Sequence, residues 1–288
     1  MRAKKTYICL AALIPFLLVA LLYEILPLIM VMINSFQPDQ GSGFTLGNYT
    51  TVFTKLIYQK AIINSIKISV TSAVIGILIA FIGAKAVDDC RGRMSYFFTT
   101  VLNMVSNFAG VPLAFAYMIL LGNAGWMVHV GQRLGLEGLA NYNLYTSGGM
   151  SLIYVYFQIP LATLLLIPAF DGIRKEWQEA NALLGGSGVG FWWHVGLPVL
   201  MPSIMGTFSV LFANALAAYA TVYALMMNNI SLLPIQIAGS YVGEIQIRKG
   251  LGGALSVVMM ILMVCMILIT NRISRIYEPT SRKRGECA

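Results

Sequence analysis

Long apolar runs, separated by short polar breaks, dominate the amino-acid sequence. A helix needs about 20 mostly apolar residues to cross the hydrocarbon core of a bilayer. The strands of a membrane β-barrel would instead be about 10 residues long and strictly alternating, whereas the runs here are continuous. The pattern predicts an all-α membrane protein with six transmembrane helices, at residues 7–33, 62–87, 96–121, 150–170, 203–227 and 252–274.

Composition also indicates an integral membrane protein. Only 10% of the 288 residues are charged and 58% are hydrophobic, whereas a soluble domain has about 25% charged residues. The first run is far longer than the apolar region of a signal peptide, and no small-x-small cleavage site follows it, so we expect it to remain in the mature protein. No internal repeat and no low-complexity linker occurs, which indicates a single domain over residues 1–288.

The basic residues predict how the helices are oriented. Cytoplasmic loops of membrane proteins carry an excess of Lys and Arg, and 13 of the 19 basic residues lie at one set of span ends. Both termini and the second and fourth connections are therefore expected to be cytoplasmic, which an even number of spans allows. The 13 residues are Arg2, Lys4, Lys5, Lys85, Arg91, Arg93, Arg174, Lys175, Arg272, Arg275, Arg282, Lys283 and Arg284.

Residues suited to catalysis or metal binding are scarce. The histidines, His129 and His194, fall in loops on opposite sides, and the four cysteines are too scattered for a CxxC metal site. Neither HExxH nor the P-loop motif Gly-x4-Gly-Lys-Ser/Thr occurs. We therefore expect no enzyme activity, cofactor or metal in this chain. The net charge of +8 is assigned to cytoplasmic loops rather than to nucleic-acid binding.

The cytoplasmic connection at residues 171–202 is much longer than a helix hairpin requires. Asp171 as N-cap, followed by good helix formers, predicts a helix that Gly185-Gly186 ends with a left-handed C-cap. Ser187 then caps a second short helix, which we expect to stop at Pro198. Two interpretations of this helix–turn–helix stay open, an amphipathic helix on the bilayer surface or a docking element for a soluble partner. The long external connections, 34–61 and 122–149, can each hold a short interfacial helix.

A spaced motif occupies the cytoplasmic connection. Glu179-Ala180, Gly185, nine further residues, Val195, one residue and Leu197-Pro198 reproduce the pattern EAA-x3-G-x9-I-x-LP. The chain therefore resembles the permease subunits of bacterial ATP-binding-cassette (ABC) importers, of type I with the MetI-like fold. It departs from the motif at Asn181, where alanine is usual, and at Val195, where isoleucine is usual.

The resemblance covers about residues 44–275 and is greatest to the spermidine/putrescine branch of these permeases. Phe44-Thr-Leu-Gly-Asn-Tyr-Thr-Thr-Val-Phe and the Asn-Ser pair that begins the second span carry it outside the loop. It implies import of a small polar or charged solute, with a polyamine as the first expectation. Iron(III), phosphonate, thiamine and sulfate are the alternatives within the branch, and a secondary transporter is the alternative of another class.

The resemblance also implies partners. These are a dimer of cytoplasmic ABC ATPases that binds ATP-Mg, a second and paralogous permease, and an extracytoplasmic solute-binding protein, all at a bacterial inner membrane. The loop would be the coupling helix, in which Glu179 pairs with a basic residue of the ATPase and Ala180 allows close approach. The coupling residues implied are Glu179, Ala180, Asn181, Gly185, Val195, Leu197 and Pro198.

Polar residues within the spans are candidates for the translocation path. Glu24 is the only acidic residue in a span, and it lies near the external half, where interfacial solvation is the alternative. The other candidates either line the path or form hydrogen bonds between helices. They are Asn103 and Asn107 in the third span and Asn214, Tyr219 and Tyr223 in the fifth. Trp192 and Trp193, beside His194, fit an aromatic belt at the membrane edge better than a ligand site.

Overall fold

The computed structural model describes residues 13–40, 43–90, 92–226, 230–242 and 247–277. All regular elements in these ranges are helices, and six are long and apolar enough to cross a membrane, which confirms the predicted fold class. Residues 7–12 of the first predicted span, Met227 of the fifth, Arg91, and the basic residues of both termini lie outside the described ranges. The six helices are Leu13–Ser35, Leu56–Asp89, Val111–Leu134, Ser147–Phe170, Gly188–Ala217 and Lys249–Tyr277.

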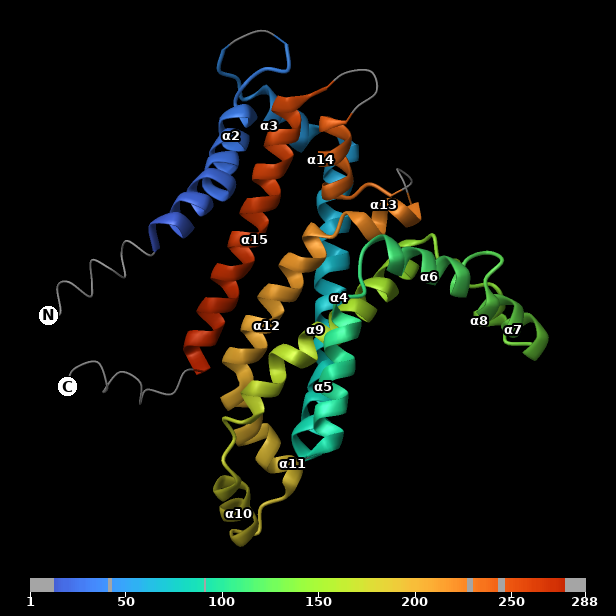
Figure 1. Ribbon diagram of the computed structural model, residues 1–288, viewed down its shortest axis with the longest axis vertical. Coiled ribbons are helices and arrows are strands. Elements are labelled where there is room, and N and C mark those ends of the chain that lie inside the picture. The colour runs from blue at the N-terminus through green and yellow to red at the C-terminus, as the bar shows by residue number, and fades with distance from the viewer. Residues whose placement is uncertain (1–12, 41–42, 91, 227–229, 243–246, 278–288) are drawn as a thin grey trace, which may run out of the picture.

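Four long helices form the body of the molecule, and α2 packs against one of them, α15 (Figure 1). They are α4 (Leu56–Asp89), α9 (Ser147–Phe170), α12 (Leu197–Ala217) and α15 (Lys249–Tyr277). The first span contains the π-helix η1 (Leu21–Ile25) and α2 (Leu26–Ser35). The shorter helices around this body are α3 (Gly47–Thr54), α5 (Arg93–Ser106), α6 (Val111–Leu121), α7 (Trp126–Leu134), α8 (Glu137–Ala140), α13 (Ala220–Met226) and α14 (Leu233–Tyr241).

Small residues let α4 and α9 pack closely. A buried row of small side chains follows one face of α4, and a Cβ added to Gly76 would lie 3.3 Å from Gln158 Cβ on α9. Gln158 is fully buried and its Nε2 donates to Ser72 Oγ at 2.8 Å. Close backbone approach and hydrogen bonds between helices are what associate helices in lipid, where apolar burial gives little drive. The row on α4 consists of Ala61, Ser65, Ser69, Ser72, Ala73, Gly76, Ala80 and Ala84.

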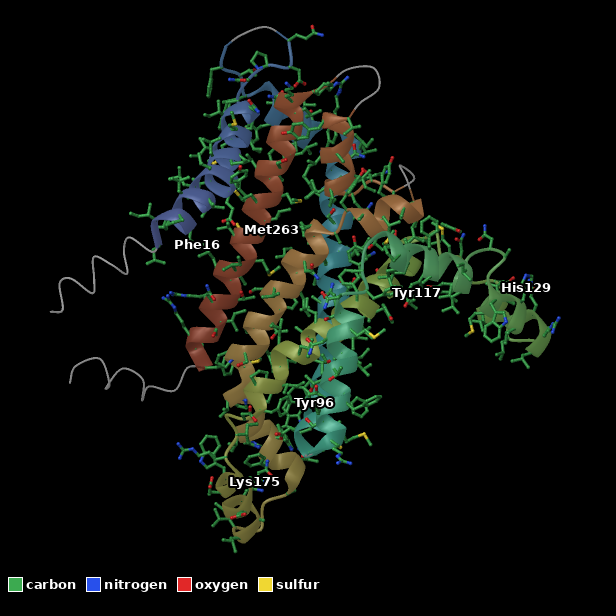
Figure 2. The ribbon with its side chains drawn as sticks, viewed as in Figure 1. Phe16, Tyr96, Tyr117, His129, Lys175 and Met263 are labelled. Carbon is green, nitrogen blue, oxygen red and sulfur yellow. The ribbon has the colours of Figure 1, made fainter. Side chains whose placement is uncertain are left out.

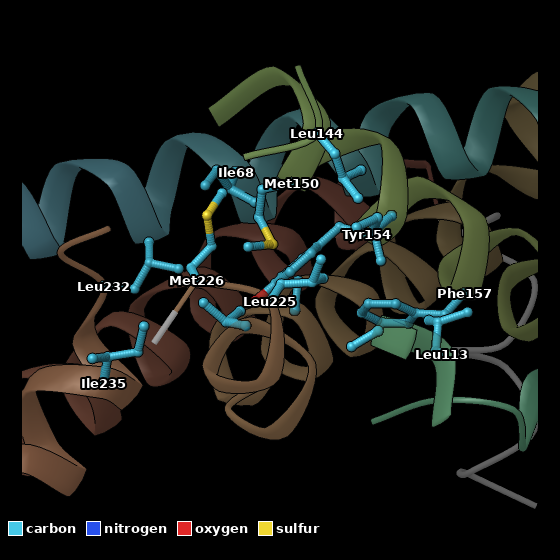
Figure 3. Packing of buried hydrophobic residues seen from close by; sticks show 14 of the residues in the cluster. Ile68, Leu113, Leu144, Met150, Tyr154, Phe157, Leu225, Met226, Leu232 and Ile235 are labelled. Carbon is cyan, nitrogen blue, oxygen red and sulfur yellow. The ribbon is translucent and has the colours of Figure 1, made fainter. Parts of the chain in front are cut away.

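Buried apolar side chains extend this contact in three clusters. The first, shown in Figure 3, joins Ile68 of α4 and Tyr154 of α9 to α6, α13 and α14. The second cluster lies toward the opposite end of α4 and α9 and includes Phe170 of α9 and Leu200 of α12. The third joins α15 to α3, α4, α12 and α14. The clusters therefore tie every long helix to α4 or to a neighbour of α4.

The third and fifth spans are interrupted, so the continuous helices predicted at 96–121 and 203–227 are wrong. In the third, α5 ends at Ser106 and α6 starts at Val111, and Gly110 between them has φ +75°. This backbone region suits glycine, which has no Cβ. The third candidate span is the segment Val111–Leu134, in which residues 122–125 separate α6 from α7. In the fifth, α12 already begins at Leu197 and gives way to α13 after Ala217.

The two interruptions lie side by side. Thr221 Oγ1 donates to the carbonyl of Gly110 at 3.2 Å, which joins the fifth span to the break in the third. Tyr154 Oη of α9 donates to the carbonyl of Ala218 at 3.0 Å. A helix break within a membrane is tolerated where neighbouring groups satisfy the backbone that it frees. These two side chains meet that requirement for one carbonyl at each break.

Polar contacts hold the end of the molecule opposite the long 171–202 connection. Asp39 Oδ1 accepts from the backbone N–H groups of Gly250 and Leu251, at 2.8 and 3.3 Å, and so caps the start of α15. Asn48 Nδ2 donates to the carbonyls of Ser35 and Gln37, at 3.0 and 2.8 Å. Short helices are present in the connections predicted at 34–61 and 122–149, as α3 in the first and as α7 and α8 in the second. Figure 1 shows α7 and α8 to the side of the bundle. Their place at a membrane interface stays a prediction.

The α4–α9 contact predicts that Gly76→Leu destabilises the fold. The added side chain has no room beside Gln158, and overpacking of this kind costs about 1–3 kcal/mol. We expect a lower midpoint of thermal unfolding for the detergent-solubilised protein, followed by tryptophan fluorescence. Gly206→Leu on α12 is the matched control, because a Cβ at Gly206 meets no atom within 4 Å. Equal midpoints for the two variants would contradict the close packing.

Candidate functional site

The connection between α9 and α12 projects beyond the body of the molecule (Figures 1 and 2). It contains α10 (Lys175–Leu183), α11 (Gly188–Phe191) and the π-helix η2 (Trp192–Gly196), so the expected helix–turn–helix is present. No residue of α10 is buried. Leu183 and Leu184 are 89% and 88% exposed, so they form an apolar surface that the described residues do not cover.

The turn after α10 is stabilised by its own backbone. Gly185 has φ +77°, as predicted for a left-handed C-cap. The N–H of Gly186 donates to the carbonyl of Asn181 at 2.9 Å, and the N–H of Gly185 donates to that of Ala182 at 3.0 Å. These two bonds form a Schellman motif, which satisfies carbonyls at the helix end. Ser187 caps α11 as expected, with its Oγ accepting from the N–H of Gly190 at 3.1 Å.

Asn181, a departure from the usual motif, makes a further contact across the turn. Its Nδ2 donates to the carbonyl of Ser187 at 3.3 Å, which links α10 to the start of α11. The same side chain fills the space beside Gly186, where an added Cβ would lie 2.3 Å from Asn181 Oδ1. Asn181 and Gly186 therefore fit each other, and a Cβ at position 186 would displace the Asn181 amide from its bond to Ser187.

Two of the predicted boundaries in this connection are wrong. Asp171 is the C-cap of α9 rather than the N-cap of α10, since the turn at Gly172 and Ile173 intervenes and Arg174 takes the N-cap position. The second helix does not stop at Pro198 but continues through η2 into α12. The widened turn at η2 allows the chain to pass Pro198 without a break.

The motif residues divide into two groups along this connection. Glu179 and Ala180 lie on α10 and are exposed. Val195, Leu197 and Pro198 lie in η2 and the first turn of α12 and are half-buried. Gly185 lies in the turn between the groups. One half of the motif is thus available for contact and the other half attaches the loop to the bundle.

Trp192, the first residue of η2, packs against aromatic side chains of two other helices. Its ring centroid lies 6.1 Å from that of Phe81 on α4 and 6.0 Å from that of Phe170 at the end of α9. It packs against the second apolar cluster. Trp193 is 68% exposed, and the belt assignment stays a prediction for both tryptophans.

The structure does not gather the predicted path residues into one site. Glu24 lies in η1 and borders a mostly apolar cavity of about 360 Å³ between α2 and α15. Asn103 and Asn107 lie on α5 and at its C-cap, and their amide groups donate to carbonyls one turn earlier, those of Thr99 and Asn103, at 2.9 and 2.8 Å. These amide donors therefore bond within their own helical segment rather than between helices.

The remaining path candidates lie in the interrupted fifth span. Tyr219 and Tyr223 stack with their ring centroids 5.2 Å apart, at the break between α12 and α13. Asn214 is exposed on α12, one turn before the break. Because Thr221 reaches the backbone of Gly110, the tyrosine pair lies in the segment that joins the two interruptions. The role of all these residues in a path stays a prediction.

Sequence reasoning did not select the side chains that position these segments. Tyr154, Gln158 and Thr221 each make a hydrogen bond to another helix or to its break. Among them, only Gln158 carried a usable signal, as an amide within an otherwise apolar span. Tyrosine and threonine are ordinary members of apolar helices, so their partners become visible only in three dimensions.

The known proteins that resemble this chain in sequence are transport system permease proteins. A scan against protein-family models finds no match. The thiamine transport system permease protein ThiP of Salmonella typhimurium is 24% identical over 210 residues, which is 72% of this chain and 38% of ThiP. The spermidine/putrescine transport system permease protein PotC homolog of Mycoplasma genitalium is 24% identical over 273 residues, which is 88% of each chain. This chain thus spans well under half of ThiP and most of the PotC homolog.

A solved structure matches almost the whole fold. A chain of the bacterial ABC transporter involved in the import of alginate, in complex with an alginate pentasaccharide-bound periplasmic protein, aligns with a TM-score of 0.78. The alignment covers 96% of both chains at 16% identity. This chain is similar in sequence to transport system permease proteins and shares the fold of the ABC transporter chain. The family resemblance inferred from the motif in residues 179–198 is thereby confirmed.

The fit between Asn181 and Gly186 predicts a pair of compensating substitutions. Gly186→Ala forces a clash in the turn, and a cost of about 1.4 kcal/mol would raise the local opening equilibrium about tenfold. Hydrogen–deuterium exchange of peptides covering residues 175–191 measures this opening. Adding Asn181→Ala to Gly186→Ala removes the clash, so exchange in the double variant should match that of Asn181→Ala alone. Exchange in the double variant as fast as in Gly186→Ala would disprove the contact.

Proposed function

We propose that this chain is the permease subunit of an ABC importer, in which it forms the solute path and couples to a separate cytoplasmic ATPase. The observation that carries the proposal is α10, a projecting helix with no buried residue that presents Glu179 and Ala180 of the EAA motif. The exposed Leu183 and Leu184 add an apolar contact surface beside them. This chain carries no P-loop motif, so ATP-Mg would be bound by the partner.

The loop geometry suits a coupling role. A docking helix transmits force well when its ends are held, and here the Schellman turn, the Ser187 cap and the Asn181 amide hold the end toward α11. The second helix is continuous with α12, from Gly188 to Ala217. Closure of the ATPases would then move α10, α11 and α12 together as a rigid body, which is a common way of switching access.

The same proposal assigns partners and sides of the membrane. The end of the molecule that carries α10 would be cytoplasmic, with Lys85, Arg93 and Arg174 near it in agreement with the excess of basic residues there. The partners would be a dimer of ABC ATPases, a second permease that is a paralogue of this chain, and an extracytoplasmic solute-binding protein. The location would be the inner membrane of a bacterium.

A secondary transporter is the alternative of another class. Its sites combine interrupted helices with intramembrane charge at the same place, and the third and fifth spans here are indeed interrupted. However, Glu24, the one acidic residue within the spans predicted from the sequence, lies in the first span at the cavity beside α15. The interruptions and the charge are therefore in different parts of the bundle, which favours the ABC permease.

For the solute we propose a polyamine. The PotC homolog aligns over 88% of both chains, whereas ThiP aligns over only 38% of its own length. Thiamine, sulfate, iron(III) and phosphonate are the alternatives. Uptake of radiolabelled spermidine by cells with and without the chain tests the choice, and we expect it to be lost without the chain. Retained spermidine uptake with loss of thiamine or sulfate uptake would replace the polyamine by that solute.

The coupling assignment predicts the effect of two substitutions in the loop. Glu179→Lys should place like charges together at the ATPase contact, and Gly185→Pro cannot adopt the φ of +77° that the turn requires. We expect both variants to insert in the membrane but to lose ATPase association and to reduce uptake about tenfold or more. Glu137→Lys, the same charge reversal on α8, is the control and should transport normally. Wild-type uptake by both loop variants would overturn the assignment.

The class itself is tested by purifying the tagged chain from gently solubilised native membranes and identifying the co-purified proteins by mass spectrometry. We expect a cytoplasmic ATPase together with a second permease. Recovery of the intact chain without any ATPase, in a detergent that preserves other ABC complexes, would leave α10 as a surface helix and would favour the secondary transporter.

A further inference from the structure

The helix α10 has little direct contact with the body of the molecule. It packs mainly on α11. A polar cavity of about 220 Å³ separates it from the end of α4, with Lys175 and Gln178 on the side of α10 and Asp88 and Asp89 on the side of α4. A displacement of α10 must therefore reach the spans through its chain connections or through side chains of α11 and η2.

The side chain of Trp192 provides such a contact. Its ring meets Phe191 of α11 edge-on, with centroids 5.9 Å apart and planes at 84°, and it meets Phe81 of α4 at 6.1 Å and 86°. Aromatic rings favour this edge-to-face arrangement. A Cβ at Gly196 would lie 2.5 Å from Trp192 Cε3, so the ring position depends on glycine one turn later. The ring thus bridges the loop to α4.

A charge on α4 completes the contact. Lys85 Nζ lies 5.3 Å from the centroid of the Trp192 ring, within the range of a cation–π interaction, for which tryptophan is the best aromatic partner. Lys85 follows Phe81 by four residues on α4, so both present the same helical face to the ring. Lys85 also forms an ion pair with Asp89. Its attraction to Trp192 acts between α4 and the loop, whereas the ion pair stays within α4.

We infer that Lys85 and Trp192 form the joint through which movement of α10 and α11 is transmitted to α4. The inference rests on the proposed function and specifies one contact within it. Both are positioning residues, because they hold the loop against α4 and touch no nucleotide or solute. When Trp192 moves with η2, its contacts with the Phe81 ring and the Lys85 amine move the end of α4. The close packing of α4 and α9 then moves α9 as well.

The test uses the complete transporter, co-purified with its ATPase from native membranes and reconstituted in vesicles. Lys85→Met removes the charge and keeps the length of the side chain, whereas Lys85→Arg retains a cation over the ring. For Lys85→Met we expect normal co-purification of the ATPase and normal basal ATP hydrolysis, with solute uptake per ATP lowered about fivefold or more. Lys85→Arg should restore most of that ratio.

Asp89→Asn is the matched control, since it removes the ion pair of Lys85 but leaves the cation and the ring in place. An exposed pair of this kind contributes little, so uptake per ATP should stay at the wild-type value. Should Lys85→Met fail to accumulate, Trp192→Phe tests the same contact with a smaller ring, and an intermediate loss of uptake per ATP is expected.

Wild-type uptake per ATP in Lys85→Met, or in Trp192→Phe where that variant replaces it, would overturn the inference. Loss of ATPase association in parallel with uptake would also overturn it, because the contact would then serve docking rather than transmission. Absence of an ATPase from the wild-type preparation is a different result, which would reject the proposed function before any variant is compared.

Discussion

The close contact between α4 and α9 determines where the other parts of the molecule lie. Within a bilayer, burial of apolar side chains gives helices little reason to associate, so shape and hydrogen bonding decide which faces meet. Gly76 lets the backbone of α4 approach Gln158, and the bond from Gln158 to Ser72 fixes the register of the two helices. The ends of α4 and α9, with Phe81 and Phe170, are placed together by this register.

A loop without a hydrophobic core of its own must be held in its conformation by other interactions. In the connection between α9 and α12 these are local hydrogen bonds, with backbone bonds at Gly185 and Gly186, the cap at Ser187 and the amide of Asn181. Preorganisation of this kind lowers the entropy cost of ordering the loop when a partner binds. The exposed leucines at the end of α10 can therefore serve recognition, because they are not required to hold the loop together.

Hydropathy predicted the number of spans, and the spacing of residues in the 171–202 connection predicted the family resemblance, because both depend on residue type along the chain. Hydropathy missed the interruption at Ala218, where the flanking residues are as apolar as those of a continuous helix. At Gly110 the sequence did carry a signal, because Asn107, Gly110 and Pro112 are polar or helix-breaking residues. The partners Thr221 and Tyr154, which make these breaks tolerable, come from distant segments. For the same reason the packing of Trp192 against Phe81 and Phe170 cannot be predicted from the sequence, which indicates only aromatic residues near a membrane edge.

The π-helix η2 has a consequence for the register of the fifth span. A π-turn holds one residue more than an α-turn, and one residue corresponds to about 100° of rotation around an α-helix. Because η2 adds this rotation, the N-terminal cap of α11 lies at the turn after α10, while Leu200 and Ile204 of α12 still pack in the second apolar cluster. Shortening this segment by a single residue would rotate the whole docking surface around the axis of the span. The length of residues 192–196, more than their identity, therefore sets the direction in which α10 and α11 face relative to the bundle.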